Sequence, residues 1–184
     1  AIDQLRTHIN IPIIGVEPAI KPAVEQSESN SIAIMVTQAT ANNSRFQQLI
    51  NSHKQNANVI IQACPGLVEI VETDNINSEQ CHTLLRQYLL PLKNSTTDTV
   101  VLGCTHYPFL ASNIQLILGS DINLVETSTP VAKQLQRQLQ QHDISANTHN
   151  ISRLSFYSTK ASLQQEEIFS HLWQNKITLK NLTI

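Results

Sequence analysis

Residues 99–108 read TVVLGCTHYP and show most clearly the pattern from which the fold of this chain can be predicted. The first four are β-branched or aliphatic and predict a short buried strand. The next five begin with small or polar side chains, and the proline that follows them is typical of the first turn of a helix. The stretch therefore predicts a strand that ends in a polar loop and runs directly into a helix, which is the repeating unit of α/β proteins.

The same unit recurs along the chain. We expect strands at residues 11–16, 31–36, 58–62, 99–102, 122–125 and 154–157. Helices are expected at 18–24, around Phe46, Leu49 and Ile50, and at 67–72, 78–90, 108–118, 130–141 and 162–173. Strands of four to six residues that are apolar on both faces are typical of a parallel sheet covered on two sides. The predicted fold class is therefore α/β, a parallel sheet with helices on both faces.

The composition argues against several classes of protein. The chain has 184 residues, of which 41% are hydrophobic and 14% charged, and its formal net charge is −2. Because this balance is near neutral and Lys and Arg do not cluster, we expect no nucleic-acid partner. No apolar run approaches the ~18 residues of a membrane span and no leader pattern opens the chain, so we expect no membrane partner. The chain has three cysteines, an odd number, and it is long enough to fold without disulfide bonds. This pattern indicates a reducing compartment, so the predicted localisation is cytoplasmic.

Loops after the strands carry the candidate chemistry, because ligands of open parallel sheets lie beyond the carboxyl ends of the strands. Neither G-x-x-x-x-G-K-[ST] nor G-x-G-x-x-G occurs, so we expect no nucleotide cofactor. Helix N-termini at these loops still present free N–H groups that suit a carboxylate. Glu17 precedes a proline at the end of the first expected strand and is a candidate for contacting the ligand. Cys64, which precedes a proline, and Cys81, on an apolar helix face, are expected to be packing residues.

Cys104 is the most informative side chain in these loops. A thiol at a helix N-terminus beside an imidazole is a setting in which the pKa of cysteine falls. Thr105 adds a hydroxyl and a backbone N–H group, and His106 adds a general acid or base. Three uses of such a cysteine stay open: the nucleophile of a Cys–His hydrolase, a zinc ligand, and a thiolate base toward an acidic C–H bond. Further zinc ligands at the required spacing do not occur, so no metal is expected.

Four segments of the chain resemble glutamate racemases, the family that makes D-glutamate for peptidoglycan. GCTHYPFL at residues 103–110 is the most specific of them. GVEPAIKPA at 15–23 resembles the family's G-V-x-P-A-I-K-P-A segment, and ACP at 63–65 with LVE at 67–69 resembles its C-P-x-L-V-E segment. LVETS at 124–128 stands where the family has an L-V-D-S-G-like stretch. The resemblance covers essentially the whole chain.

The resemblance implies a cofactor-independent reaction that interconverts L- and D-glutamate. In the family, two cysteines flank the substrate Cα in a cleft between two α/β domains, one removing the α-proton and the other delivering a proton to the opposite face. Cys104 resembles the second of these cysteines, and His106 resembles an auxiliary acid–base residue. Thr105 and His106 resemble residues that contact the substrate. Glu72, rather than Glu69, falls where the family has an acidic residue that assists catalysis.

Part of the family pattern does not occur in this chain. The family's first catalytic cysteine lies in a C-N-T motif after a D-S-G strand, and neither motif is present. The resemblance therefore predicts a truncated racemase that is inactive alone. Residues 1–14 are expected to be a remnant of the N-terminal domain, 15–123 a complete central α/β domain, and 124–184 the return of the chain to the first, incomplete α/β domain.

Other functions and partners stay open at this point. The side chains that grip the distal carboxylate of the substrate cannot be identified from the sequence, so a racemase of aspartate or another amino acid is one alternative. A non-catalytic module that holds a small dicarboxylate or a protein is a second alternative. Many members of the family form dimers, which makes a homodimer a further expected assembly, although no apolar stripe in the sequence marks an interface.

Overall fold

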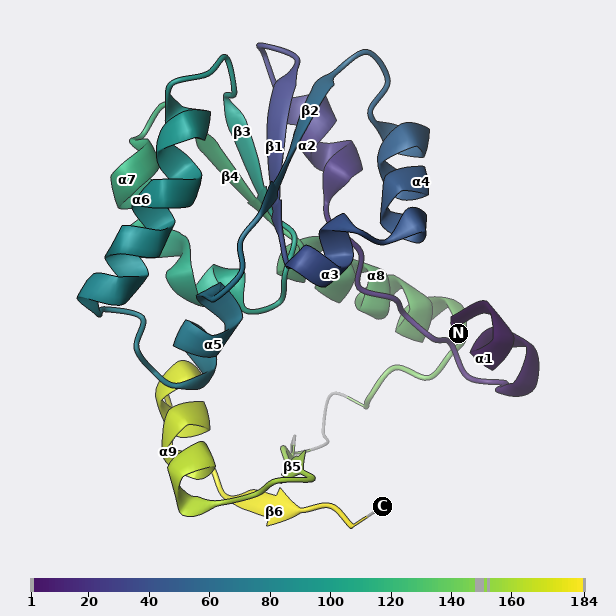
Figure 1. Cartoon of the computed structure of the whole chain (residues 1–184). Helices are drawn as coiled ribbons and strands as arrows, with labels where there is room; N and C mark the ends of the chain where they lie inside the picture. The colour runs from purple at the N-terminus through teal and green to yellow at the C-terminus, as the bar shows by residue number, and fades with distance from the viewer. Residues whose placement is uncertain (1, 148–150, 152, 184) are drawn as a thin grey trace.

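A four-stranded parallel sheet organises the chain (Figure 1). The structure, a computed structural model, describes residues 2–147, 151 and 153–183. The strands are β1 (Ser31–Val36), β2 (Asn58–Ala63), β3 (Thr99–Leu102) and β4 (Asn123–Glu126), and their order in the sheet is β2-β1-β3-β4. All three pairings are parallel, so the four carboxyl ends and the loops that follow them lie at one edge of the sheet. The predicted α/β class is confirmed.

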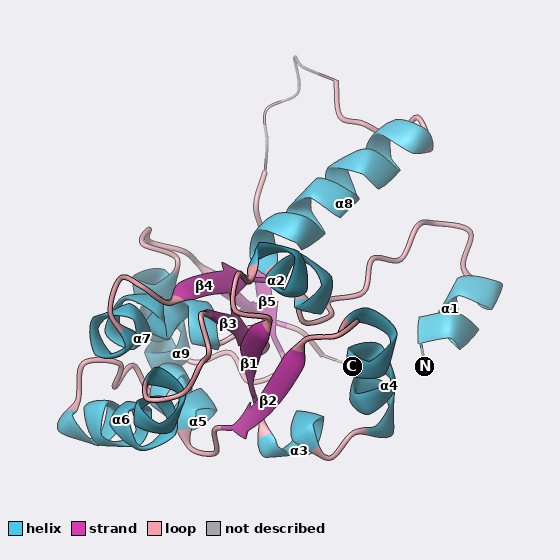
Figure 2. Ribbon diagram, turned by 90° about the horizontal axis from the view of Figure 1, so that it is seen from above, coloured by secondary structure: helices cyan, strands magenta, loops and turns pink. Residues whose placement is uncertain are grey.

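Helices cover both faces of this sheet (Figure 2). One face carries α2 (Ile20–Gln26) and α4 (Ser44–His53), and the short α3 (Gln38–Ala41) follows β1. The other face carries α5 (Leu67–Glu72), α6 (Glu79–Lys93), the 3-10 helix η1 (Tyr107–Leu110) and α7 (Ala111–Leu118). The two faces divide β1 by alternation: Ala33 and Met35 enter one core, whereas Ile32, Ile34 and Val36 enter the other.

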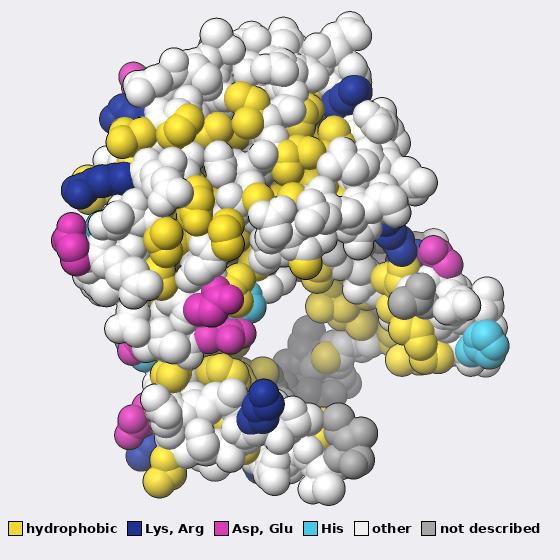
Figure 3. Space-filling model, viewed as in Figure 1, with side chains coloured by type: hydrophobic (Ala, Val, Ile, Leu, Met, Phe, Trp, Pro, Cys, Tyr) yellow, Lys and Arg dark blue, Asp and Glu magenta, His cyan; other side chains and the backbone are white. Residues whose placement is uncertain are grey.

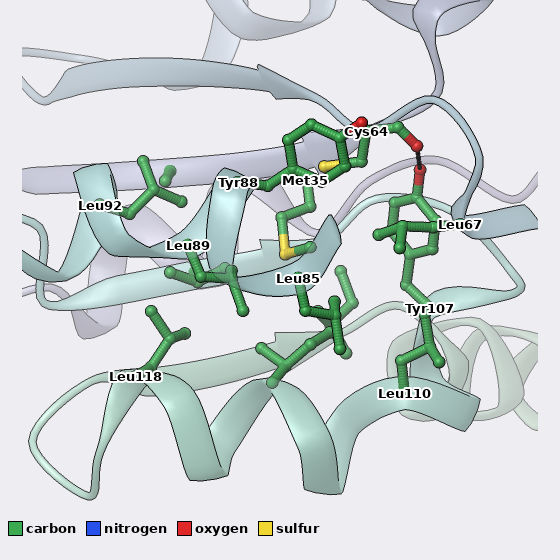
Figure 4. Packing of buried hydrophobic residues seen from close by; sticks show 14 of the residues in the cluster. Met35, Cys64, Leu67, Leu85, Tyr88, Leu89, Leu92, Tyr107, Leu110 and Leu118 are labelled. Atoms are coloured by element: carbon green, nitrogen blue, oxygen red, sulfur yellow. Dashed lines mark hydrogen bonds between the residues drawn. The ribbon is translucent and has the colours of Figure 1, made fainter. Parts of the chain in front are cut away.

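The core on the α5–α7 face is the larger of the two. Figure 4 shows Leu85 and Leu89 of α6 in this core, together with Met35 of the sheet and Leu118 of α7. All four side chains are buried. This core extends to Tyr107 and therefore reaches the loop that holds Cys104, so the candidate site is built on packed structure.

A smaller unit lies beyond the carboxyl edge of the sheet (Figure 1). It contains β5 (Phe156–Ser158), α9 (Leu163–Leu172) and β6 (Leu179–Asn181), and its two strands pair in parallel. The connection from β4 runs through α8 (Ser128–Gln141). Neither α8 nor the N-terminal α1 (Ile2–His8) buries a described side chain. On α9, Nδ1 of His171 lies 2.6 Å from Oδ1 of Asp74, which follows α5, so this pair joins the small unit to the larger one.

One expected strand does not form, and one observed strand was not expected. The apolar run Ile11–Val16 forms neither strand nor helix, and Ile11 and Val16 are 67% and 56% exposed. An apolar run becomes a strand only when another strand pairs with it, and the described residues offer none beside this segment. The strand β6 was not predicted, because its three residues include Lys180 and Asn181 and carry no apolar pattern.

Several boundaries differ by a few residues. The strand expected at 154–157 is observed at Phe156–Ser158, and the helix expected from Pro130 begins two residues earlier, at Ser128. The sheet of the expected central domain extends to Glu126, because β4 pairs with β3 along its full length. These shifts are typical of element ends, which a sequence pattern defines poorly.

Candidate functional site

Three loops meet at the carboxyl edge beside the central strand β1. The backbone N–H of Gly103 donates to the Met35 carbonyl at 2.9 Å, and the N–H of Cys64 donates to the Val36 carbonyl at 2.9 Å. A Cβ atom at Gly103 would lie 2.8 Å from the Met35 oxygen and 2.9 Å from Cγ1 of Val36, so only glycine fits there. This close approach places the next residue, Cys104, directly beside the end of β1.

Cys104, His106 and Glu72 form a continuous line of polar contacts. Sγ of Cys104 lies 3.8 Å from Nδ1 of His106, and Nε2 of the same imidazole lies 3.2 Å from Oε1 of Glu72. Glu72 is the last residue of α5, a helix that starts after Gly66 in the left-handed conformation (φ 88°). The fold therefore brings together a thiol and an imidazole from the loop after β3 and a carboxylate from the end of α5.

This arrangement defines the proton positions on His106. Because a carboxylate only accepts hydrogen bonds, Nε2–H of the imidazole donates to Glu72. In the neutral imidazole, Nδ1 is then the unprotonated nitrogen, and it faces the thiol of Cys104. The geometry lets His106 accept a proton from Cys104 and return it, while Glu72 holds the tautomer. Oγ1 of Thr105 lies 3.5 Å from the same Nδ1 and is exposed, so a ligand can reach it.

The pKa of Cys104 departs from the sequence expectation. Burial of the half-buried thiol raises its pKa, and the backbone N–H groups of His106 and Tyr107 offset only part of this rise. The expected fall in the pKa of Cys104 is therefore wrong for this structure. The residues after the thiol form a 3-10 helix, η1, and α7 begins only at Ala111, so the thiol does not stand at the N-terminus of the α-helix itself, where the dipole acts. Cys104 is consequently a thiol at neutral pH until a base takes its proton.

The other two cysteines are packing residues, as expected. Cys64 is 1% exposed and Cys81 is fully buried on the inner face of α6, and both are free thiols. Burial raises the pKa of Cys64 to about 12, with a smaller contribution from the nearby Cys104. Its Sγ donates to the Gln62 carbonyl at 3.4 Å. None of the three cysteines lines the cavity beside His106, but Cys104 is next to it through its contact with the imidazole.

A cavity of about 890 Å³ opens next to the imidazole. Its wall on the side of the sheet includes Glu72, Thr105 and His106, and its opposite wall comes from β5, α9 and the segments next to them. The space-filling view shows a hollow between the two units of the chain, with apolar side chains along it (Figure 3). The volume is ample for a small dicarboxylate, since ligand pockets in proteins span roughly 300–1,000 Å³.

Glu17 lies apart from these residues. Its carboxylate pairs with the Arg45 guanidinium at 3.5 Å, and it lines a separate cavity of about 770 Å³ together with Thr40. The structure thus brings Cys104, Thr105 and His106 together with Glu72, and it does not bring Glu17 to them.

Sequence reasoning missed the hydroxyl groups after β1. Thr37 caps α3, since its Oγ1 accepts the Thr40 N–H at 3.2 Å, and the two hydroxyl oxygens lie 3.0 Å apart. β1 lies between β2 and β3, so this loop follows a strand adjacent to that of Cys104. The available signal was the position of the loop after a strand that is buried along its whole length, which marks a central strand.

The described residues show neither a metal-binding cluster nor a membrane-spanning helix. No group of three or more His, Cys, Asp and Glu side chains among them is arranged to hold a metal ion. In the same part of the chain, no helix combines the length and apolar character needed to cross a membrane.

A parallel α/β fold with a thiol–imidazole–carboxylate line at its carboxyl edge defines a class of acid–base sites. Comparison with known proteins gives the family. A model of the Asp/Glu/hydantoin racemase family matches residues 1–135, and the chain belongs to this family. Among curated relatives, a glutamate racemase of Herpetosiphon aurantiacus is 44% identical over 144 residues, which are 78% of this chain and 57% of the relative. A glutamate racemase of Methylococcus capsulatus is 41% identical over 76% of this chain and 52% of its own length. The chain therefore spans little more than half the length of these relatives.

Solved structures share the fold. A glutamate racemase isoform of Bacillus anthracis superposes with a TM-score of 0.87 at 27% identity, over 100% of this chain and 69% of the other. A glutamate racemase of Escherichia coli superposes with a TM-score of 0.82 at 24% identity, over 98% of this chain and 68% of the other, and this likeness concerns the fold alone. The small unit with β5, α9 and β6 is thus part of the arrangement that these structures share.

Proposed function

We propose that this chain carries one half of the active site of a glutamate racemase, with Cys104 as one of two acid–base groups. The observation that supports this most directly is the line from Cys104 through His106 to Glu72, in a chain of the Asp/Glu/hydantoin racemase family. The line opens on a cavity large enough for an amino acid. The reaction removes the α-proton of glutamate on one face and delivers a proton on the other.

Each residue has a separate role in this proposal. Glu72 keeps the proton of His106 on Nε2, so that Nδ1 takes the thiol proton of Cys104. The resulting thiolate accepts the α-proton in one direction, and the thiol delivers a proton in the other. Because the pKa of Cys104 is raised by burial, the thiol is the resting form, which suits the delivering step. The exposed Thr105 side chain offers a hydroxyl donor for a substrate carboxylate.

The mechanism needs a second acid–base group on the opposite face of the substrate. Cys64 and Cys81 do not supply it, since both thiols are buried in the core, whereas Cys104 is only half-buried. We therefore assign the second group to the part of the racemase that this chain does not span, and we expect no racemisation by the chain alone. In this organisation, residues 15–126 are the central domain, because β4 pairs with β3 in its sheet, and residues 1–14 and 127–184 belong to the second domain. The homodimer stays a prediction.

Glutamate is the proposed substrate, and D-glutamate for peptidoglycan is the proposed use of the product in the cytoplasm. The curated relatives named above are glutamate racemases, which supports this choice. The family description also includes aspartate and hydantoins, so those substrates are the alternatives within the same chemistry. A non-catalytic dicarboxylate-binding module is the alternative outside it.

The test is a hybrid protein in which this chain is joined to the part of the Herpetosiphon aurantiacus relative that it does not span. Incubated with L-glutamate in D₂O, the hybrid is expected to form D-glutamate and to replace the α-proton with deuterium, both followed by NMR and chiral chromatography. Parallel reactions with L-aspartate and a 5-substituted hydantoin test the substrate. Racemisation of one of these instead of glutamate would reassign the substrate. Binding of glutamate without exchange of the α-proton would favour the non-catalytic module.

The chain alone provides the second arm. With L-glutamate in D₂O it is expected to form no D-isomer, because a single acid–base group cannot serve both faces of the substrate. Rapid formation of D-glutamate by the unmodified chain would contradict the assignment of half a site.

A further inference from the structure

We propose that Tyr107 is a positioning residue for Cys104: its buried ring and hydroxyl fix the turn that holds two backbone N–H groups against the thiol. The proposal rests on the role of Cys104 in the function proposed above. It assigns a task to a residue of the GCTHYP stretch that the acid–base line itself does not use.

The Tyr107 side chain is anchored at its far end. It is fully buried, and its hydroxyl donates to the Cys64 carbonyl at 3.3 Å, as Figure 4 shows by the dashed line. That carbonyl belongs to the loop after β2, whereas Tyr107 belongs to the loop after β3, and β1 lies between the two strands. The hydrogen bond therefore spans the end of the central strand and ties together the two loops that carry Cys104 and lead to Glu72.

The backbone of Tyr107 is fixed at the near end by a turn. Its N–H donates to the Cys104 carbonyl at 3.1 Å, which closes the turn over Thr105 and His106. The N–H groups of His106 and Tyr107 also lower the pKa of Cys104 against the dominant effect of burial. Both N–H groups lie in a turn whose last residue, Tyr107, is the anchored one. If the turn loosens, these donors move away from the thiolate, and the pKa of Cys104 rises further because nothing then offsets the effect of burial.

The titratable groups around Cys104 come from three elements. His106 on its own loop touches the thiol, and Glu72 of α5 touches His106. Cys64 after β2 lies close enough to interact electrostatically, but it stays a thiol because its pKa is about 12. Burial and the neighbouring Cys64 raise the pKa of Tyr107 well above its ordinary range, so its hydroxyl remains a donor throughout the pH range in which thiols titrate.

Tyr88 offers a matched control. Its hydroxyl donates to the Pro65 carbonyl at 2.8 Å, one residue further along the same loop, and its side chain is also buried. Tyr88 comes from α6, however, and has no backbone connection to the Cys104 turn. Replacing either tyrosine with phenylalanine removes one hydroxyl donor from the same loop, so the two variants loosen the loop to a similar degree. If Tyr107 acts on Cys104 through its own turn, only Tyr107→Phe changes the pKa of Cys104. If both tyrosines merely stabilise the loop, the two variants have the same effect.

The experiment follows alkylation of Cys104 by iodoacetamide in the 184-residue chain, with mass spectrometry of the Cys104 peptide, between about pH 6 and about pH 10. Tyr107→Phe is expected to move the midpoint of the pH profile upward by about half a pH unit, because the variant weakens one hydrogen bond to the thiolate. At pH values below both midpoints, this shift slows alkylation about threefold. Tyr88→Phe is expected to keep the midpoint of the unmodified chain. Far-UV circular dichroism establishes that each variant is folded under the assay conditions.

Either of two results would overturn the proposal: an unchanged midpoint in a folded Tyr107→Phe chain, or an equal upward shift in both tyrosine variants. Replacement of Tyr107 by p-aminophenylalanine, which keeps the ring and an N–H donor, gives an independent measurement. It is expected to retain the midpoint of the unmodified chain, and an upward shift there would also count against the anchor. Because no substrate is present, these results do not depend on whether the hybrid racemises glutamate.

Discussion

Asp98 holds the amino-terminal edge of the sheet, opposite the candidate site, and its replacement by asparagine gives a quantitative test of the fold. The carboxylate precedes β3 and accepts two hydrogen bonds of 2.6 Å, from the Ser27 hydroxyl and from the Ser29 backbone N–H. Burial alone would raise the pKa of Asp98, but hydrogen bonds from Ser27, Ser29 and Thr99 outweigh it and lower the pKa to about 2.

The magnitude follows from this shift. Lowering the pKa from 3.8 to about 2 corresponds to about 2.4 kcal/mol of stabilisation by the ionised form, at about 1.36 kcal/mol per pH unit. Because the side chain is partly exposed, solvent screening reduces this to about 1 kcal/mol. The pKa of the folded state is below that of the unfolded state, so the stabilisation is fully present above about pH 4 and is lost as the pH falls toward 2.

The assay is urea unfolding of the unmodified chain and of Asp98→Asn. At pH 7, Asp98→Asn is expected to lower the free energy of unfolding by about 1 kcal/mol. At about pH 3 the difference is expected to fall to roughly half, because the unfolded chain is by then largely protonated at this position. Asp121→Asn is the control, since Asp121 is exposed and accepts a local hydrogen bond, from the hydroxyl of the neighbouring Ser120 at 3.1 Å. A pH-independent loss in Asp98→Asn, or an equal loss in the control, would refute the reasoning.

Three further predictions concern the site and the elements that hold it. Gly103→Ala is expected to destabilise the chain by about 1–3 kcal/mol in urea unfolding, because the added Cβ meets the Met35 carbonyl at 2.8 Å; an unchanged midpoint would contradict this packing. Ser78→Ala removes the side chain that accepts the Cys81 N–H at the start of α6 and is expected to cost about 1 kcal/mol, with Ser52→Ala, at an exposed position of α4, as a neutral control. Glu72→Gln replaces the carboxylate with an amide that no longer fixes the tautomer of His106. This variant is expected to lower kcat of the hybrid racemase by at least about tenfold, with less effect on KM. An equal loss in Glu69→Gln would show that the contact with His106 is not the cause.

The sheet was predictable because its strands are buried on both faces. Ser31–Val36 and Thr99–Leu102 were predicted with their observed bounds, since their patterns are continuous and their ends carry polar residues or glycine. The run at Ile11–Val16 has the same pattern but lacks a neighbouring strand among the described residues, and a sequence pattern cannot report whether a partner is present. The short β6 depends on its pairing with β5 rather than on its own composition.

The residues of the site could be predicted from the sequence, but their burial and contacts could not. The sequence singled out Cys104 and His106, and the resemblance singled out Glu72, which the fold places 3.2 Å from the imidazole. The pKa of Cys104 was predicted with the wrong sign, because the burial of a thiol depends on tertiary packing and outweighs the local N–H groups. The sequence indicated no role for Tyr107 beyond its place in the motif, because its hydrogen bond to the Cys64 carbonyl joins residues that are 43 positions apart.

The central claim is that Cys104 exchanges a proton with the substrate Cα. Its most direct test is the rate of deuterium incorporation at Cα of glutamate in D₂O, measured for the hybrid racemase with Cys104→Ser and with Cys81→Ala. Cys81 is fully buried on α6, so its variant controls for the loss of a thiol elsewhere in the chain. Cys104→Ser is expected to abolish exchange from at least one enantiomer, whereas Cys81→Ala is expected to retain it. Near-normal exchange from both enantiomers by Cys104→Ser would contradict the central claim.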